Sequence, residues 1–354
     1  MPSTAAHAAI RRATHRAHRA IDALDARALA ELTRAYEAAA RDIAERMRYA
    51  AGADDRLAIA ELRNVRDQVN GIVGRLNDAR NALFDDALRE ASRIGVSPFD
   101  PLSGVTLRVT SPVLMQVSEE AVRFLRTFVA RDGLQLSDRI WRIESGMRDA
   151  VVGAIERAVI LGQSAEEAAR DFLARGEAPG RDLLVKARQA APDAIAHEVD
   201  RELAGAAADA RRLFRTEINR AQGEAYMKAG ADHPGFAGWR FLLSPAHPAP
   251  DICDLLSEQN LYGLGKGVYP SREKCPWPAH PNTLSYIEIV FDDEVTDADR
   301  AGKETPLAAL ERLPEKSQRG VLGEGKFDIF KQGRLSQGMI RAPLASVKER
   351  IGGA

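Results

Sequence analysis

Apolar side chains recur every three or four positions through the first part of the chain, and this spacing predicts long α-helices. Between about residues 8 and 50 the repeat includes Leu32, Ile43 and Met47, with charged residues between them. A second repeat runs to about residue 94, after a Gly- and Asp-containing break at 51–55. Two long helices joined by a short break favour an antiparallel helical hairpin over residues 1–95.

Residues 96–232 are predicted to form a helical domain with one short β element. Val105, Leu107 and Val109 alternate with polar residues, as they do in a strand with one buried face. Helical repeats then continue to about residue 230. The stretch Gly162-Gln163-Ser164 is expected to end one helix and to cap the next.

The composition supports a mainly helical fold and excludes several classes of protein. Hydrophobic residues make up 45% of the 354 residues, but aromatic residues only 6%, which favours packed helices over sandwiches or barrels. The net charge of −1 gives no overall basic field for nucleic acid, although Arg11, Arg12, Arg16 and Arg19 make the N-terminus basic. No apolar stretch is long enough for a membrane span, so we expect a protein made and kept in the cytoplasm.

The character of the chain changes after Gly230, where Pro, Gly and aromatic residues become frequent. Residues 233–300 are predicted to form a loop-rich α+β module, followed by a helical or irregular C-terminal tail over 301–354. A module with so small a core is commonly held together by a disulfide or a metal. Two thiols and two imidazoles suit a structural zinc ion, and the four candidate ligands are His247, Cys253, Cys275 and His280.

The spacing of these four residues leaves other interpretations open, because neither cysteine belongs to a CxxC pair. Both cysteines could instead be small buried hydrophobic residues, with the histidines capping turns, or they could form a disulfide. Asp251 and Asp254 are alternative oxygen ligands or turn-formers. A catalytic metal site is a further hypothesis, but the sequence has no HExxH motif and no phosphate-binding loop to support it.

Several motifs, taken in order, resemble the Mu F-like head-morphogenesis family of tailed phages. That family's pattern is a helix with an Arg-Thr-Glu motif, a Gly-Trp pair before a strand, an Asp-x-Cys turn, a Gly-containing loop and a final His-Pro. The matching residues here are Arg215, Thr216, Glu217, Gly238, Trp239, Asp251, Cys253, Asp254, Gly263, His280, Pro281 and Asn282.

The chain departs from the family at positions where many members carry further cysteines. Leu256, Thr283 and Ser285 stand at those positions, whereas Cys275 precedes the His-Pro pair. The family's metal site is therefore retained here only if His247 and Cys275 rebuild it.

The resemblance implies a structural minor head protein rather than an enzyme. Such a protein is expected in the virion head, and in the host cytoplasm during assembly, bound to the portal protein or the major capsid protein. It could also accompany the packaged DNA through non-specific contacts. Arg215 and Glu217 would then be structural, tying the small module down through ion pairs. The alternative is a zinc-dependent hydrolase or toxin-like enzyme built on a Mu F-like module.

Overall fold

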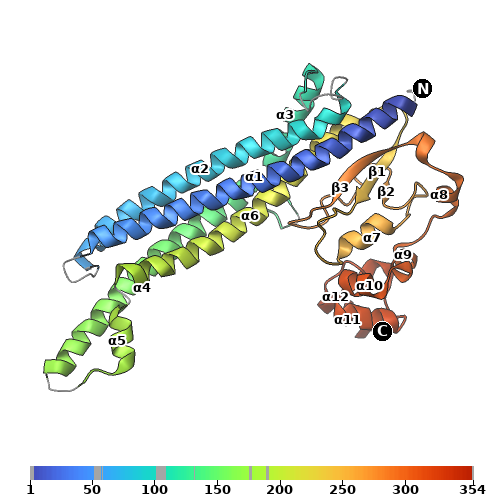
Figure 1. Cartoon of the computed structure of the whole chain (residues 1–354). Helices are drawn as coiled ribbons and strands as arrows, with labels where there is room; N and C mark the ends of the chain where they lie inside the picture. Colours follow the sequence, from blue (N-terminus) through green and yellow to red (C-terminus); the bar gives the residue numbers. More distant parts are fainter. Residues whose placement is uncertain are drawn as a thin grey trace. The chain divides into compact units, whose positions relative to one another are not determined.

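The computed structural model describes residues 4–51, 57, 59–100, 109–130, 132–174, 178–188 and 191–352. Within these ranges the chain is mainly helical, with one small antiparallel sheet of three strands (Figure 1). The predicted combination of long helices with a small sheet is confirmed. The chain divides into two compact units: unit 1 contains residues 1–24, 88–125 and 215–354, and unit 2 contains residues 25–87 and 126–214.

Unit 2 contains no strand among its described residues. The predicted repeat of the first long helix is buried there, since Leu32, Ile43 and Met47 are shielded from solvent. Val65 and Val69 on the second long helix are buried in the same way. The helices that contribute to this unit are α1 (Thr4–Ala50), η1 (Ile59–Glu61), α2 (Leu62–Val96), α4 (Leu136–Ala174), α5 (Arg181–Ala187) and α6 (Pro192–Gly230).

Side chains between the helices hold unit 2 together. Arg80 on α2 is buried, and its guanidinium donates to Glu144 on α4 over 2.6 Å. Phe84 on α2 packs against Phe214 on α6 with ring centroids 4.6 Å apart. The buried charge on Arg80 is thus paired, as burial of an ionised group requires.

The predicted helix end at Gly162-Gln163-Ser164 is wrong, because α4 continues through these residues to Ala174. A glycine inside a helix costs only about 1 kcal/mol relative to alanine, so it need not end one. Val159, Ala165 and Ala169 on either side are buried, and their packing offsets that cost.

The predicted β element falls mostly outside the described residues, which exclude 101–108. Val109, its last residue, lies in neither a helix nor a strand. α3 (Pro112–Thr127) begins soon afterwards. Proline at the first helical position favours that start, because its missing N–H would have no partner there.

The sheet of unit 1 has the strand order β2-β1-β3, with both pairings antiparallel. Trp239 on β1 lies opposite Tyr269 on β2 and Ile289 on β3. Gly238 is needed beside it, because a Cβ there would lie only 2.7 Å from the carbonyl oxygen of Tyr269. The strands are β1 (Phe236–Leu242), β2 (Val268–Tyr269) and β3 (Tyr286–Phe291).

The helix α7 (Ile252–Glu258) contributes to two apolar clusters of unit 1. Cys253 and Leu256 belong to the cluster that contains Trp239 and the rest of the sheet core. Leu255 belongs to a second cluster formed by the C-terminal helices, so this end of the chain has a core of its own. The C-terminal helices are α9 (Pro306–Arg312), α10 (Glu315–Leu322), α11 (Glu324–Lys331), η5 (Gln337–Met339) and α12 (Leu344–Gly352). Two short helices precede them, η4 (Asp292–Glu294) and α8 (Asp297–Ala301).

Among the described helices, none combines the length and the apolar character that crossing a membrane requires.

Candidate metal centre

The candidate centre forms where the loop after β1 enters α7. Asp251 is the N-cap of this helix, and its Oδ1 accepts the backbone N–H of Cys253 over 2.7 Å. In the opposite direction, Asp254 Oδ2 accepts the backbone N–H of Asp251 over 2.9 Å. This reciprocal capping box fixes both carboxylates at the start of the helix.

His280, from the loop before β3, brings its Nε2 atom to these residues. Nε2 lies 3.0 Å from Asp251 Oδ2 and 3.2 Å from Cys253 Sγ. The three ligand atoms lie within 4.8 Å of one another. We call Asp251, Cys253 and His280 the Asp251 group.

The other ring nitrogen of His280 determines what Nε2 can do. Nδ1 lies 2.8 Å from the carbonyl oxygen of Pro281, which can only accept, so Nδ1 carries the hydrogen. In a neutral ring Nε2 then presents a lone pair that can accept from the Cys253 thiol and that lies beside the Asp251 carboxylate. The same lone pair is available to a metal ion, and metal-ligating histidines commonly donate their second N–H to a backbone carbonyl.

A second group shares Asp251 and contains His247 and Asp254. His247 Nε2 lies 3.0 Å from Asp254 Oδ2 and 3.8 Å from Asp251 Oδ1. Ser317 on α10 donates to the other oxygen of Asp254 over 3.3 Å. We call His247, Asp251 and Asp254 the His247 group.

Cys275, the fourth predicted ligand, belongs to neither group of the described residues. It is buried in the apolar cluster of the sheet, and burial raises the pKa of its thiol to about 12. Both cysteines are free, so the disulfide interpretation is wrong. Three of the four predicted ligands therefore lie in the two groups, and Cys275 is a packed side chain.

Cys253 is held as a neutral thiol by its surroundings. Burial is the main cause that raises its pKa to about 12, and the charge of Asp251 raises it further. Thiolate is the form that binds metals, and a bound dication would favour it. The thiol thus has the position of a ligand but needs a cation to ionise at neutral pH.

The Arg-Thr-Glu motif on α6 contacts the turn that follows His280. Thr216 Oγ1 accepts the backbone N–H of Asn282 over 2.8 Å, and Arg215 donates to Asn282 Oδ1 over 3.4 Å. Glu217 pairs with Arg220 on the same helix at 2.9 Å. Arg215 and Thr216 therefore contact the small module by hydrogen bonds, and the predicted ion pairs of Arg215 and Glu217 with the module stay a prediction.

The other motif residues have packing or turn positions. Trp239 is buried in the sheet core, and Gly238 allows β1 and β2 to approach. Gly263 adopts a φ of 72°, which favours glycine. Pro281 supplies the carbonyl that binds His280. These residues shape the module around the site.

Sequence reasoning missed a polar face on the N-terminal part of α1 that lies against β3. Arg11 and His15 approach the buried Glu288 at 3.4 and 3.2 Å. His18 bonds the carbonyl oxygen of Ile287 over 3.2 Å, and its ring stacks on Tyr286. The spacing of Arg11, His15 and His18 at three- and four-residue steps is the sequence signal for this face.

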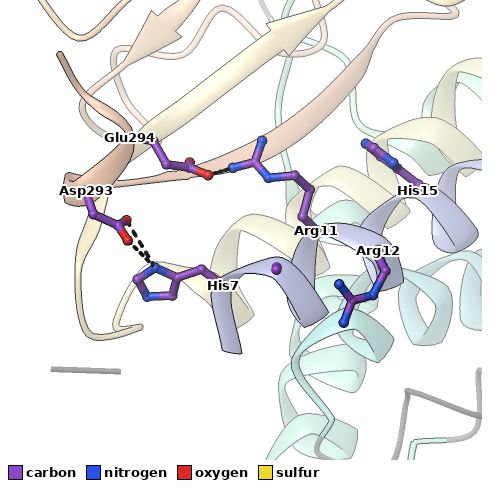
Figure 2. Close-up of a pocket in the computed structure, with 7 residues that line it drawn as sticks. His7, Arg11, Arg12, His15, Asp293 and Glu294 are labelled. Carbon is purple, nitrogen blue, oxygen red and sulfur yellow. Dashed lines mark hydrogen bonds and ion pairs between the residues drawn. The ribbon is translucent and has the colours of Figure 1, made fainter. Parts of the chain in front are cut away.

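This face also lines a pocket of about 360 Å³, formed by His7, Ala8, Arg11, Arg12, His15, Asp293 and Glu294 (Figure 2). Figure 2 shows His7 directed at Asp293 and Arg11 directed at Glu294. Because these carboxylates offset the basic side chains, the lining selects neither an anion nor a cation. The Asp251 group is therefore the better candidate for a functional site.

Comparisons of the chain with protein-family models, with curated proteins and with solved structures gave no match.

Proposed function

We propose that this chain is a structural minor head protein of a tailed phage, in which a metal ion closes the small C-terminal module. Its partners would be the portal protein or the major capsid protein during head assembly, in the virion head and before that in the host cytoplasm. The ordered motifs that resemble the Mu F-like family motivate the proposal. The arrangement of Asp251, Cys253 and His280 is the observation that carries it.

The donor set fits zinc. Thiolate, imidazole and carboxylate are its usual ligands, and one of each converges in the Asp251 group. The lone pair of His280 Nε2 faces both the Asp251 carboxylate and Cys253 Sγ, so a dication placed between them would contact all three groups. Bound there, zinc would supply a cross-link between the start of α7 and the loop before β3.

The positions that carry cysteines in many family members support the same location. Thr283 Oγ1 lies 3.9 Å from Cys253 Sγ, and Ser285 donates its backbone N–H to that hydroxyl over 3.3 Å. Leu256 shares the apolar cluster of Cys253. Because Cys275 packs in the sheet core, His247 and Cys275 do not rebuild the family's site, and the proposed site consists of Asp251, Cys253 and His280 alone.

Exposed apolar side chains in unit 2 support a docking role. α4 and α5 pack against each other, and Leu173 and Val185 on them are 63% and 56% exposed. Such surfaces commonly bind other proteins. Non-specific contact with packaged DNA is supported by the exposed Arg12 and Arg19 on α1.

Co-sedimentation with the portal and capsid proteins of the same phage tests the docking role. Leu173→Asp combined with Val185→Asp should abolish binding without loss of fold, because both side chains are exposed. Tyr49→Asp is the matched control, since Tyr49 is 83% exposed on α1 of the same unit. Binding by the double variant equal to that of the wild type would reject this surface, and no binding by the wild type would reject the head-protein proposal.

One observation favours the alternative of a zinc-dependent hydrolase or toxin-like enzyme. The Asp251 group offers three protein donors, as catalytic zinc sites do, and Asp251 and His280 are each about a third exposed. Peptide and phosphodiester substrates incubated with the zinc-loaded chain would decide between the two. Turnover that disappears in His280→Ala would establish the enzyme, and no turnover would leave the structural role.

A further inference from the structure

The turn 281–283 connects the candidate ligand His280 to β3. Asn282 within it has a φ of 63°, a left-handed conformation that asparagine adopts more readily than most residues other than glycine. Two side chains of α6 bond the backbone of the turn, and the residues of the turn also contact the Asp251 group.

The contacts from α6 bind the backbone of the turn at two of its polar groups. Thr216 Oγ1 accepts the N–H of Asn282 over 2.8 Å, and Asn219 donates to the carbonyl oxygen of Thr283 over 2.7 Å. Thr216 and Asn219 are 6% and 7% exposed, so water competes little for either bond. Both residues lie in the segment of α6 that belongs to unit 1.

The same turn contacts the Asp251 group through the backbone of Pro281 and the side chain of Thr283. His280 Nδ1 donates to the carbonyl oxygen of Pro281 over 2.8 Å, which sets the direction of Nε2. Thr283 Oγ1 lies 3.9 Å from Cys253 Sγ. A shift of the turn would therefore move the imidazole relative to both Asp251 and Cys253.

We infer that Thr216 and Asn219 are positioning residues of the metal centre, which hold the turn 281–283 so that His280 Nε2 meets Asp251 and Cys253. The inference rests on the proposed function, in which these three residues bind a metal ion. It assigns a role to the helix motif that contacts no ligand directly. Loss of residues that orient metal ligands typically weakens metal binding by about 10- to 100-fold.

Chelator competition for Co²⁺ on the full-length chain tests this role, together with the visible spectrum of the bound cobalt. Thr216→Val keeps the shape of the side chain but removes the acceptor, and we expect Co²⁺ binding about 10- to 100-fold weaker with altered absorption bands. Thr216→Ser restores the hydroxyl and should recover both the affinity and the spectrum. Asn219→Ala is the second variant if Thr216→Val does not fold.

Thr14→Val is the matched control, because Thr14 is another buried threonine of unit 1 whose hydroxyl bonds the Tyr226 hydroxyl at 2.9 Å. It should leave the cobalt affinity and spectrum unchanged even if it lowers the melting temperature. Equal affinity in Thr216→Val and wild type, or equal losses in Thr216→Val and Thr14→Val, would overturn the positioning role. A wild-type chain that binds no cobalt or zinc would overturn the proposed metal site itself.

Discussion

His280 and its two neighbours decide the chemistry of the site at the scale of single residues. Its Nδ1 donates a hydrogen bond to the carbonyl oxygen of Pro281, so Nε2 is the ring nitrogen that faces Asp251 and Cys253. Cys275 belongs to neither candidate ligand group of the described residues and is packed in the sheet core. The two cysteines therefore have different surroundings even though the sequence presents them as equivalent.

Substitution of the two cysteines separates those roles. Cys253→Ala should reduce bound zinc from about one per chain to almost none, because it removes the thiolate ligand. Cys275→Ala should keep the zinc and cost about 1 kcal/mol of stability through a small cavity. Metal analysis of the two purified variants is the measurement, and loss of zinc in Cys275→Ala would show that the ligand set is wrong.

His18 gives a second prediction at the residue scale, concerning pH. Burial lowers its pKa from 6.5 to about 4, although its Nε2–H donates to the carbonyl oxygen of Ile287. Between these two values the unfolded chain binds a proton that the folded chain does not. The free energy of unfolding should therefore fall as the pH drops from 6.5 to 4, by about 3 kcal/mol for this residue.

Urea unfolding at pH 7 and pH 4.5 tests this dependence against His18→Gln. Glutamine can donate to the same carbonyl but does not titrate, so the variant should lose less stability on acidification than the wild type. The difference between the two proteins isolates His18 from the other titrating groups. Equal losses in both would mean that His18 does not contribute.

At the scale of elements, the long helices could be predicted from sequence because their spacing is strong. α1 and α2 follow the apolar repeats, whose members Leu32 and Val65 are buried. The continuation of α4 through Gly162 could not be predicted, since a glycine signals a break only where packing does not support the helix. Val159 and Ala165 supply that support in α4, and neither contact is encoded in the local pattern.

The sequence indicates which types of residue form the candidate site, but it does not show which of them lie close together. The sequence predicts His247, Cys253 and His280 as metal ligands, and Asp251 as an alternative ligand or a turn-former. The structure confirms Asp251 as the N-cap of α7 and places its carboxylate beside His280, so its role as a ligand stays a prediction. The long path between Cys253 and His280 contains β2, and spacing along the chain could not show that Cys275 turns toward the sheet core.

At the scale of the whole molecule, unit 2 carries the exposed apolar side chains of α4 and α5, and unit 1 carries the small module with the candidate ligands. α7 connects that module to its surroundings, since Cys253 packs in the sheet cluster and Leu255 in the C-terminal cluster. A metal ion at the start of α7 would therefore stabilise more of unit 1 than the loop that binds it. Loss of the metal should therefore lower the stability of both apolar clusters.

The zinc content of the purified chain, measured together with thermal melting before and after chelation, tests the central claim most directly. The account predicts about one zinc per chain and a clear drop in melting temperature when a chelator removes it. No bound metal, together with a melting temperature that the chelator does not change, would contradict the metal centre. In that case Cys253 and His280 would form only a hydrogen-bonded pair beside Asp251.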